Sequence, residues 1–299
     1  MRRCVILIMT LLIIVSVACA QGLKPYILGA VSEEPLDIAK TYTRAHLDSA
    51  GFEILGEYAP AGDYDRWVIV ITDPEIIAAV ENFGGLRGFA AAIRVALTEE
   101  NGKVNITYTN PLYLGNAYFQ DDYQEVAHHW IFVNRKLDDM MRKLGVVDGR
   151  SFGAKVGMSA KEVRKYHYMF GMEYFEDVVE LKEFPSFTVG KNTIEAELEK
   201  GGTTDLVYAV EIPGQDLKLY GIALNGSEGE SHFLPIIDIA TPKHTAFLPY
   251  EILLMGDTAV MLHGRYRIAL SFPDLTMTTF GKIMSTPGDI QDLMESVTE

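Results

Sequence analysis

The sequence has only two cysteines in 299 residues, and both lie within the first 20 positions. Cys4 and Cys19 belong to an apolar leader, so the chain that follows the leader contains no thiol. Disulfides, thiolate metal sites, iron–sulfur clusters and cysteine nucleophiles are therefore excluded from the mature chain. We expect its stability to come from the packing of apolar side chains.

Positive charge is also scarce. The chain has 26 lysines and arginines against 41 aspartates and glutamates, which gives a formal net charge of −15 at pH 7. Such a surface repels phosphate backbones and anionic lipid headgroups. We therefore expect no nucleic-acid partner and no binding to the membrane surface.

Several well-known catalytic and phosphate-binding motifs are missing. The sequence contains no G-x-S-x-G, H-E-x-x-H, Walker or dinucleotide-binding pattern. Motifs therefore assign no reaction to this chain.

The long apolar run that is present, Cys4–Val17, predicts a secretory signal peptide over residues 1–20. It follows Arg2 and Arg3 and precedes the small-residue cleavage pattern Ala18-Cys19-Ala20. It is short for a membrane span, which needs roughly 20 residues. We expect release into the periplasm or the extracellular space. The alternative is cleavage before Cys19 and a lipid anchor on that residue.

The rest of the chain predicts an α+β fold of two duplicated units, at residues 21–147 and 191–299, with a connector over 148–190. In each unit, helical and strand periodicities follow in the order helix, strand, strand, long strand, turn, strand, proline, helix. The segments "FEILGEYAP" and "RWVIVIT" correspond to "DLVYAVEIP" and "LKLYGIALNG". We expect each unit to be an antiparallel sheet with packed helices.

The hairpin "FLPYEILLMGDTAVMLHGRYRIALSFPDLTM" carries a family resemblance. An LP-containing strand, a short turn, and a second strand leading to proline and an apolar residue resemble the signature of the domain of unknown function 302 family. The matching positions are Leu248, Pro249, Pro273, Leu275 and Met277. The first unit matches more loosely, over residues 89–111. The resemblance implies a small α+β fold and no particular activity.

A basic stripe in this hairpin is the first candidate site. If residues 260–270 form one strand, His263, Arg265 and Arg267 project from the same face, because alternate side chains share a face. Arginines arranged in this way can bind a carboxylate or another oxyanion. The alternative is a solvated face paired with surface acids.

The role of Glu251 depends on the hairpin register. A two-residue turn at Gly256-Asp257 places Leu262 opposite Glu251, and a three-residue loop that includes Thr258 places His263 there. The second register would pair a carboxylate with an imidazole. The sequence leaves both registers open.

Metal binding is the second candidate chemistry. His232 and His244 flank "FLPIIDIATPK" and could join His263, although no metal-ligand spacing connects them. In "KYHYMFGMEYF", a strand would bring His167 and Met169 to one face, a pair that suits Cu(I). The alternative for this aromatic segment is packing between the two units.

These observations favour an exported, non-enzymatic binding module. Its ligand would be a small, perhaps anionic, molecule or an envelope protein, and we expect no cofactor. The competing hypothesis is a metal- or haem-dependent enzyme or accessory protein.

Overall fold

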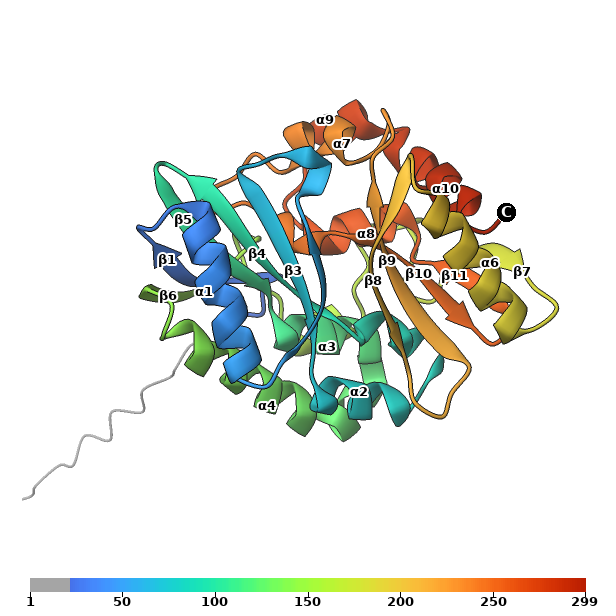
Figure 1. Cartoon of the computed structure of the whole chain (residues 1–299), viewed down its shortest axis with the longest axis horizontal. Helices are drawn as coiled ribbons and strands as arrows, with labels where there is room; N and C mark the ends of the chain where they lie inside the picture. The colour runs from blue at the N-terminus through green and yellow to red at the C-terminus, as the bar shows by residue number, and fades with distance from the viewer. Residues whose placement is uncertain (1–21) are drawn as a thin grey trace, which may run out of the picture.

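The computed structural model describes residues 22–299, so the expected signal peptide and Cys19 lie outside the described residues. The first unit contains a six-stranded antiparallel sheet in the order β2-β3-β4-β5-β1-β6 (Figure 1). Its strands are β1 (Tyr26–Ser32), β2 (Glu53–Tyr58), β3 (Arg66–Thr72), β4 (Ile93–Glu100), β5 (Lys103–Thr109) and β6 (Val146–Phe152). Its helices are α1 (Leu36–Ser49), α2 (Pro74–Glu81), α3 (Pro111–Phe119) and α4 (Tyr123–Met141).

The second unit contains a five-stranded antiparallel sheet in the order β7-β11-β10-β9-β8. Its strands are β7 (Val179–Glu183), β8 (Thr204–Glu211), β9 (Leu217–Leu224), β10 (Tyr250–Met255) and β11 (Thr258–Met261). Its helices are α6 (Phe187–Lys200), α7 (Glu230–Ile237), α8 (Gly264–Ser271), α9 (Met277–Phe280) and α10 (Thr286–Ser296). The short helix α5 (Ala160–Arg164) lies in the segment between the two sheets along the chain.

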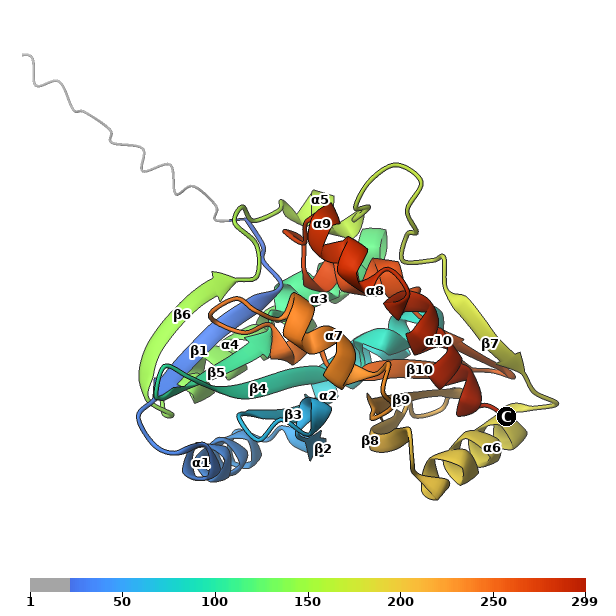
Figure 2. The same ribbon diagram turned by 90° about the horizontal axis from the view of Figure 1, so that it is seen from above.

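The two units repeat one topology. Read from β8, the second sheet has the order of the first sheet read from β2, with β7 in the place of β1 and without a counterpart of β6. Helices α1 and α6 follow equivalent strands and lie on the same side of the two sheets (Figure 2). The α+β fold with two duplicated units, each an antiparallel sheet with packed helices, is thus confirmed.

The two sheets meet through their edge strands β2 and β8. Both strands carry a bulge at the same relative place, between Ile54 and Gly56 and between Leu206 and Tyr208. A Cβ on Gly56 would lie 1.9 Å from the carbonyl oxygen of Val207, so only glycine permits this close approach of the two backbones. One hydrophobic core runs through both units.

The segment after β6 does not extend a sheet until β7 begins. It crosses the side of the molecule where α8 and α9 lie (Figure 2), and α5 packs against α3 of the first unit. Ser159 and Glu162 form a capping box at the start of α5. Within residues 22–299, no helix is both long enough and apolar enough to cross a membrane.

Candidate functional site

Two arginines and one glutamate form a buried charged cluster between the units. Arg94 on β4 and Arg267 on α8 both form ion pairs with Glu251 on β10, and the Arg267 Nη2 to Glu251 Oε2 distance is 3.1 Å. The Arg94 and Glu251 side chains are each 1% exposed. Burial of this depth lowers the pKa of Arg94.

Tyr208 is the third side chain that contacts the Glu251 carboxylate. Its hydroxyl donates a hydrogen bond of 2.7 Å to Glu251 Oε1. Gly221 on the strand between them makes this reach feasible, because a Cβ there would lie 1.9 Å from the Tyr208 ring. Burial raises the pKa of Tyr208, so its hydroxyl stays protonated and remains a donor.

The hairpin of β10 and β11 closes on the two-residue turn, and this fixes which residue lies opposite Glu251. Met255 pairs with Thr258 across Gly256-Asp257. Continuing this register places Leu262, and not His263, opposite Glu251. The carboxylate is therefore not beside the imidazole, and its partners come from β4, β8 and α8 instead.

The prediction that His263, Arg265 and Arg267 share one face of a strand is wrong. The second hairpin strand, β11, ends at Met261, and α8 starts at Gly264 with His263 as its N-cap. On a helix, positions two apart point about 200° apart, so the stripe separates. Arg267 turns into the core, while the Arg265 side chain is 48% exposed.

Glu173, from the loop before β7, brings His263 and Arg265 together at the surface. Its Oε1 lies 3.4 Å from His263 Nε2 and 3.4 Å from Arg265 Nη1. His263 Nδ1 accepts the backbone N–H of Arg265 at 3.2 Å, which assigns the ring proton of the neutral imidazole to Nε2, facing Glu173. Partial burial lowers the pKa of His263, and Glu173 opposes that effect.

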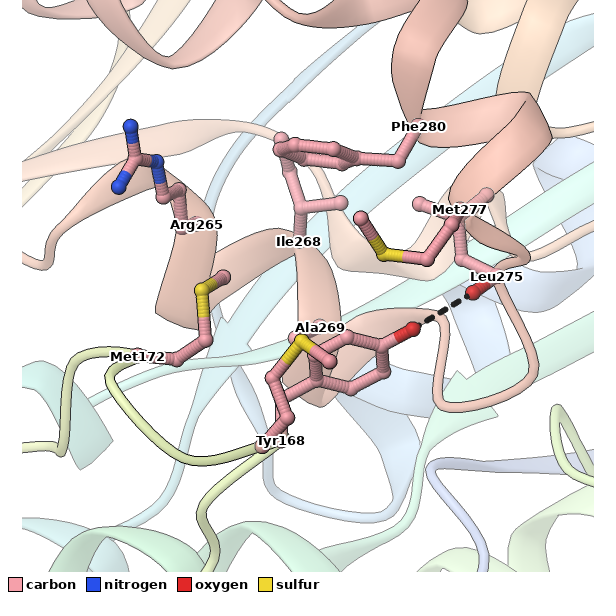
Figure 3. A pocket seen from close by; sticks show the side chains of 9 residues that line it. Tyr168, Met172, Arg265, Ile268, Ala269, Leu275, Met277 and Phe280 are labelled. Atoms are coloured by element: carbon pink, nitrogen blue, oxygen red, sulfur yellow. Dashed lines mark hydrogen bonds between the residues drawn. The ribbon is translucent and has the colours of Figure 1, made fainter.

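An apolar cavity of about 100 Å³ lies beside this cluster, between the loop 168–172 and helices α8 and α9. Methionines and aromatic rings form most of its wall (Figure 3). The lining residues are Tyr168, Met169, Met172, Arg265, Ile268, Ala269, Leu275, Met277 and Phe280. In Figure 3 the stem of Arg265 borders the cavity and its guanidinium points away from the centre, at the rim.

An open groove adjoins the cavity and shares Tyr168 with it. Its volume is about 820 Å³, and its wall includes Lys161, Lys165 and His167. The Tyr168 hydroxyl donates to the carbonyl of Leu275 at 3.0 Å, which fixes the ring between the groove and the cavity. Both hollows are thus built by the connector against the second unit.

The aromatic segment 166–175 is not a strand, so His167 and Met169 do not share a strand face. His167 stacks on Tyr174 at 4.1 Å between ring centroids, and Met169 lines the cavity. Packing between the units accounts for part of the segment. The Phe175 ring lies 5.2 Å from Tyr118 of the first unit and 6.1 Å from Tyr266 of the second.

The other candidate metal ligands have separate surroundings. His232 is half-buried on α7, whereas the His244 ring stacks on Phe272 at 4.8 Å. Burial lowers the pKa of His244. Between residues 22 and 299, no three histidine, cysteine, aspartate or glutamate side chains are placed to share a metal ion.

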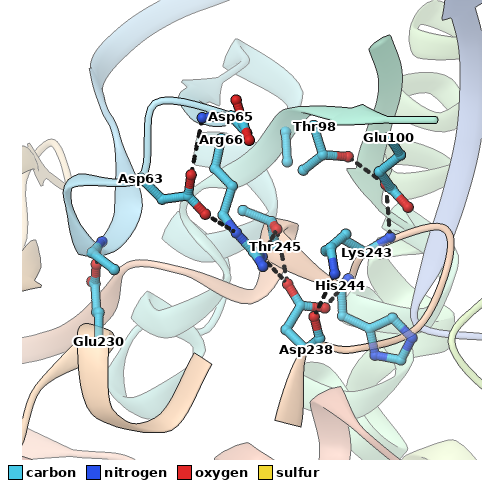
Figure 4. A network of polar contacts seen from close by, with 12 residues as sticks. Asp63, Asp65, Arg66, Thr98, Glu100, Glu230, Asp238, Lys243, His244 and Thr245 are labelled. Atoms are coloured by element: carbon cyan, nitrogen blue, oxygen red, sulfur yellow. Dashed lines mark hydrogen bonds and ion pairs between the residues drawn. The ribbon is translucent and has the colours of Figure 1, made fainter. Parts of the chain in front are cut away.

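A second polar network joins the units on the side of β3 and α7 (Figure 4). Arg66 contacts Asp238 and donates to Asp63 at 2.9 Å, while Thr245 donates to Asp238 at 2.9 Å. Nearby, Glu230 is fully buried and accepts hydrogen bonds of 2.8 Å from the Tyr58 hydroxyl and the Ala61 N–H. Burial raises the pKa of Glu230 to about 7, although both donors act against this rise.

Sequence reasoning missed Arg94, Tyr118 and Glu173. The internal repeat held a signal for Arg94, because the segments 89–97 and 246–254 align without a gap and place Arg94 at the position of Glu251. Opposite charges at matching positions of two packed repeats indicate an ion pair. Glu173 lies in a loop whose path has no periodic signal.

Comparison with known proteins gives a likeness to a solved structure. No protein-family profile matches the chain, and no curated protein matches it in sequence. The structure resembles the crystal structure of an uncharacterized conserved protein, DUF302, from Bacillus stearothermophilus, at 15% identity. The match covers 40% of this chain and 97% of that chain, with a TM-score of 0.35. The description of that protein names the family that residues 247–277 resemble in sequence.

Proposed function

We propose that the protein is an exported binding module for a small amphipathic ligand with an apolar body and an anionic end. The apolar body would occupy the methionine-lined cavity, and the anionic end would lie at the rim beside Arg265. Export rests on the predicted signal peptide over residues 1–20. The observation that carries the ligand class is an arginine at the mouth of an otherwise apolar cavity.

The chemistry of the wall supports this ligand class. Methionine side chains are flexible and polarisable, so Met169, Met172 and Met277 can adapt to apolar groups of different shapes. A volume of about 100 Å³ suits a short alkyl chain or one small ring. Arg265 supplies a half-exposed cation. Its ion pair with Glu173 partly neutralises that charge and so weakens its attraction for a bound anion.

A titration of the mature chain with hexanoate tests the proposal, with hexanol as the uncharged ligand of the same chain length. Methionines labelled with ¹³C in their methyl groups report directly on the cavity in NMR spectra. We expect the signals of the cavity methionines to shift with both ligands, and hexanoate to bind roughly 2–5-fold more tightly, since exposed ion pairs contribute about 0.2–1 kcal/mol.

Matched variants separate the two parts of the site. Arg265→Gln should remove the preference for hexanoate, whereas Arg150→Gln, which removes an exposed charge from β6, should keep it. Cavity signals that move with neither ligand would refute the binding function. Equal affinities for hexanoate and hexanol in the unmodified protein would refute the anionic end.

A protein partner is the second candidate function, and the groove that adjoins the cavity favours it. An extended segment of an envelope protein could lie between Lys161 and Lys165 and place one apolar side chain in the cavity. Native mass spectrometry of the protein from its own host's envelope distinguishes the two candidates. A small-molecule adduct supports the first, and a stoichiometric protein partner supports the second.

A further inference from the structure

A second binding site lies at the buried charged cluster, away from the surface cavity. We propose that Arg94 and Arg267 together bind one small monatomic anion of the halide class in the core between the two units. The proposal is independent of the amphipathic ligand described above, because the residues that carry it are different.

The charges of the cluster do not balance. Arg94 and Arg267 carry one positive charge each, and Glu251 is the carboxylate that pairs with both. The three side chains are 1%, 6% and 1% exposed, so water does not screen the remaining positive charge. A buried charge without compensation is strongly destabilising, and an anion would provide the missing compensation.

The two arginines also have more hydrogen-bond donors than their surroundings have acceptors. Arg267 donates to the Tyr118 hydroxyl at 3.0 Å and to the carbonyls of Phe247 and Pro249 at 2.7 and 3.0 Å. Its Nε has no partner among the described residues, and neither has the Nε of Arg94. A guanidinium has five N–H donors and no acceptor, so each unused N–H favours an acceptor or an anion.

A small cavity lies beside the two arginine side chains. Both arginines line a cavity of about 20 Å³, together with the hydroxyl-bearing residues Tyr26, Thr109, Tyr113, Tyr118 and Ser271. Tyr26, Thr109 and Tyr113 donate to the backbone carbonyls of Ser271, Ala246 and Leu270, so their protons are already used. The Tyr118 hydroxyl accepts from Arg267 and keeps its own proton for a further acceptor.

The size and lining of this cavity determine the class of anion. About 20 Å³ accommodates one particle of the size of a water molecule, which a halide ion resembles and a phosphate or sulfate ion exceeds. No described residue that lines it is acidic. A single halide would contact donors from β4 and α3 of the first unit and from α8 of the second, and would thereby connect the units.

Thermal unfolding of the full mature chain tests the site. Chloride would replace gluconate, which is too large for the cavity, at constant ionic strength. We expect the Tm to rise by roughly 2–3 °C for each tenfold increase in chloride once the site begins to fill. Arg94→Gln should abolish this rise, because it removes the excess charge. Arg150→Gln makes the same charge change on the surface and should keep it.

Each other outcome overturns the proposal. Equal Tm values in chloride and gluconate would mean that the cavity holds water. The same rise in Arg94→Gln would mean that chloride acts on the protein surface. Should Arg94→Gln fail to fold, crystals of the unmodified protein grown in sodium bromide decide the question. An anomalous peak in the cavity lined by Arg94 and Arg267 supports the site, and its absence refutes it.

Discussion

The two units share a strand order but differ in the polar residues at matching positions. Arg94 of the first unit and Glu251 of the second pair across their sheets with the equivalent residues Val70 and Gly221. On the next strand, Val70 pairs with Gly56 in the first unit, and Gly221 pairs with Tyr208 in the second. At these matching positions the first unit supplies a cation, and the second supplies a carboxylate with its tyrosine donor.

The comparison shows what a duplicated fold preserves and what it changes. Backbone topology, edge bulges and the close contact of β2 with β8 are common to both units. Two identical units would place like charges against each other where β4 and β10 approach, and like charges repel. Opposite charges at this position make one unit the specific partner of the other.

The largest expected effect comes from removing the negative charge of the cluster. Glu251→Gln leaves two buried arginines without a carboxylate, and we expect it to lower the free energy of unfolding by about 3–5 kcal/mol. Urea unfolding measures the loss. Glu33→Gln is the control, since Glu33 pairs with Lys103 at an exposed position and should change stability by less than about 1 kcal/mol. Equal effects of the two substitutions would show that the cluster does not join the units.

The two buried glutamates have different partners. Glu230 accepts hydrogen bonds from neutral donors, whereas Glu251 forms ion pairs with two arginines. The native pKa of Glu230 is about 7, against an ordinary value of 4.5. Between these values the folded chain keeps the proton and the unfolded chain has lost it. The contribution of Glu230 therefore makes stability fall as pH rises from 4.5 to 7, by about 3 kcal/mol in total.

Glu230→Gln should remove this dependence. We expect the free energy of unfolding of the variant, relative to the unmodified protein, to increase by about 3 kcal/mol between pH 4.5 and pH 8, as measured by urea unfolding at several pH values. Taking the difference between the two proteins cancels the titration of other groups. A difference that does not vary with pH would show that Glu230 is already ionised in the folded protein below pH 4.5.

The sequence was sufficient to predict the repeat because strand periodicity and turn signals are local. The hairpins close on two-residue turns at Asn101-Gly102 and Gly256-Asp257, and for the second of these the sequence had left a three-residue loop open as the alternative. The ends of the hairpins were predicted less well. The segment after Leu262 has alternating apolar residues that fit a strand, yet it folds as α8. The tertiary position of Arg267, inside the core, could not follow from local spacing.

The candidate cavity could not be predicted from local spacing either, because its wall comes from segments far apart in the chain. Its wall combines the loop 168–172 with α8 and α9, about 100 residues further along the chain. The loop has no periodicity that fixes its path, and a strand interpretation placed Met169 beside His167. Only the tertiary contacts, such as that between Tyr168 and Leu275, determine which side chains meet there.

The equivalent helices α3 and α8 begin with different N-cap residues, and exchanging them should have the smallest effect on stability. Asn110 begins α3 and His263 begins α8, and each accepts a backbone N–H two residues further on, at 3.1 and 3.2 Å. His263→Ala should cost about 1 kcal/mol, because it leaves an N–H of the first turn unpaired. His263→Asn, which copies the first unit, should recover that loss in urea unfolding, since asparagine is among the preferred N-cap residues. If His263→Asn is as unstable as His263→Ala, then the contact of the imidazole with Glu173, and not the cap, is what stabilises this helix start.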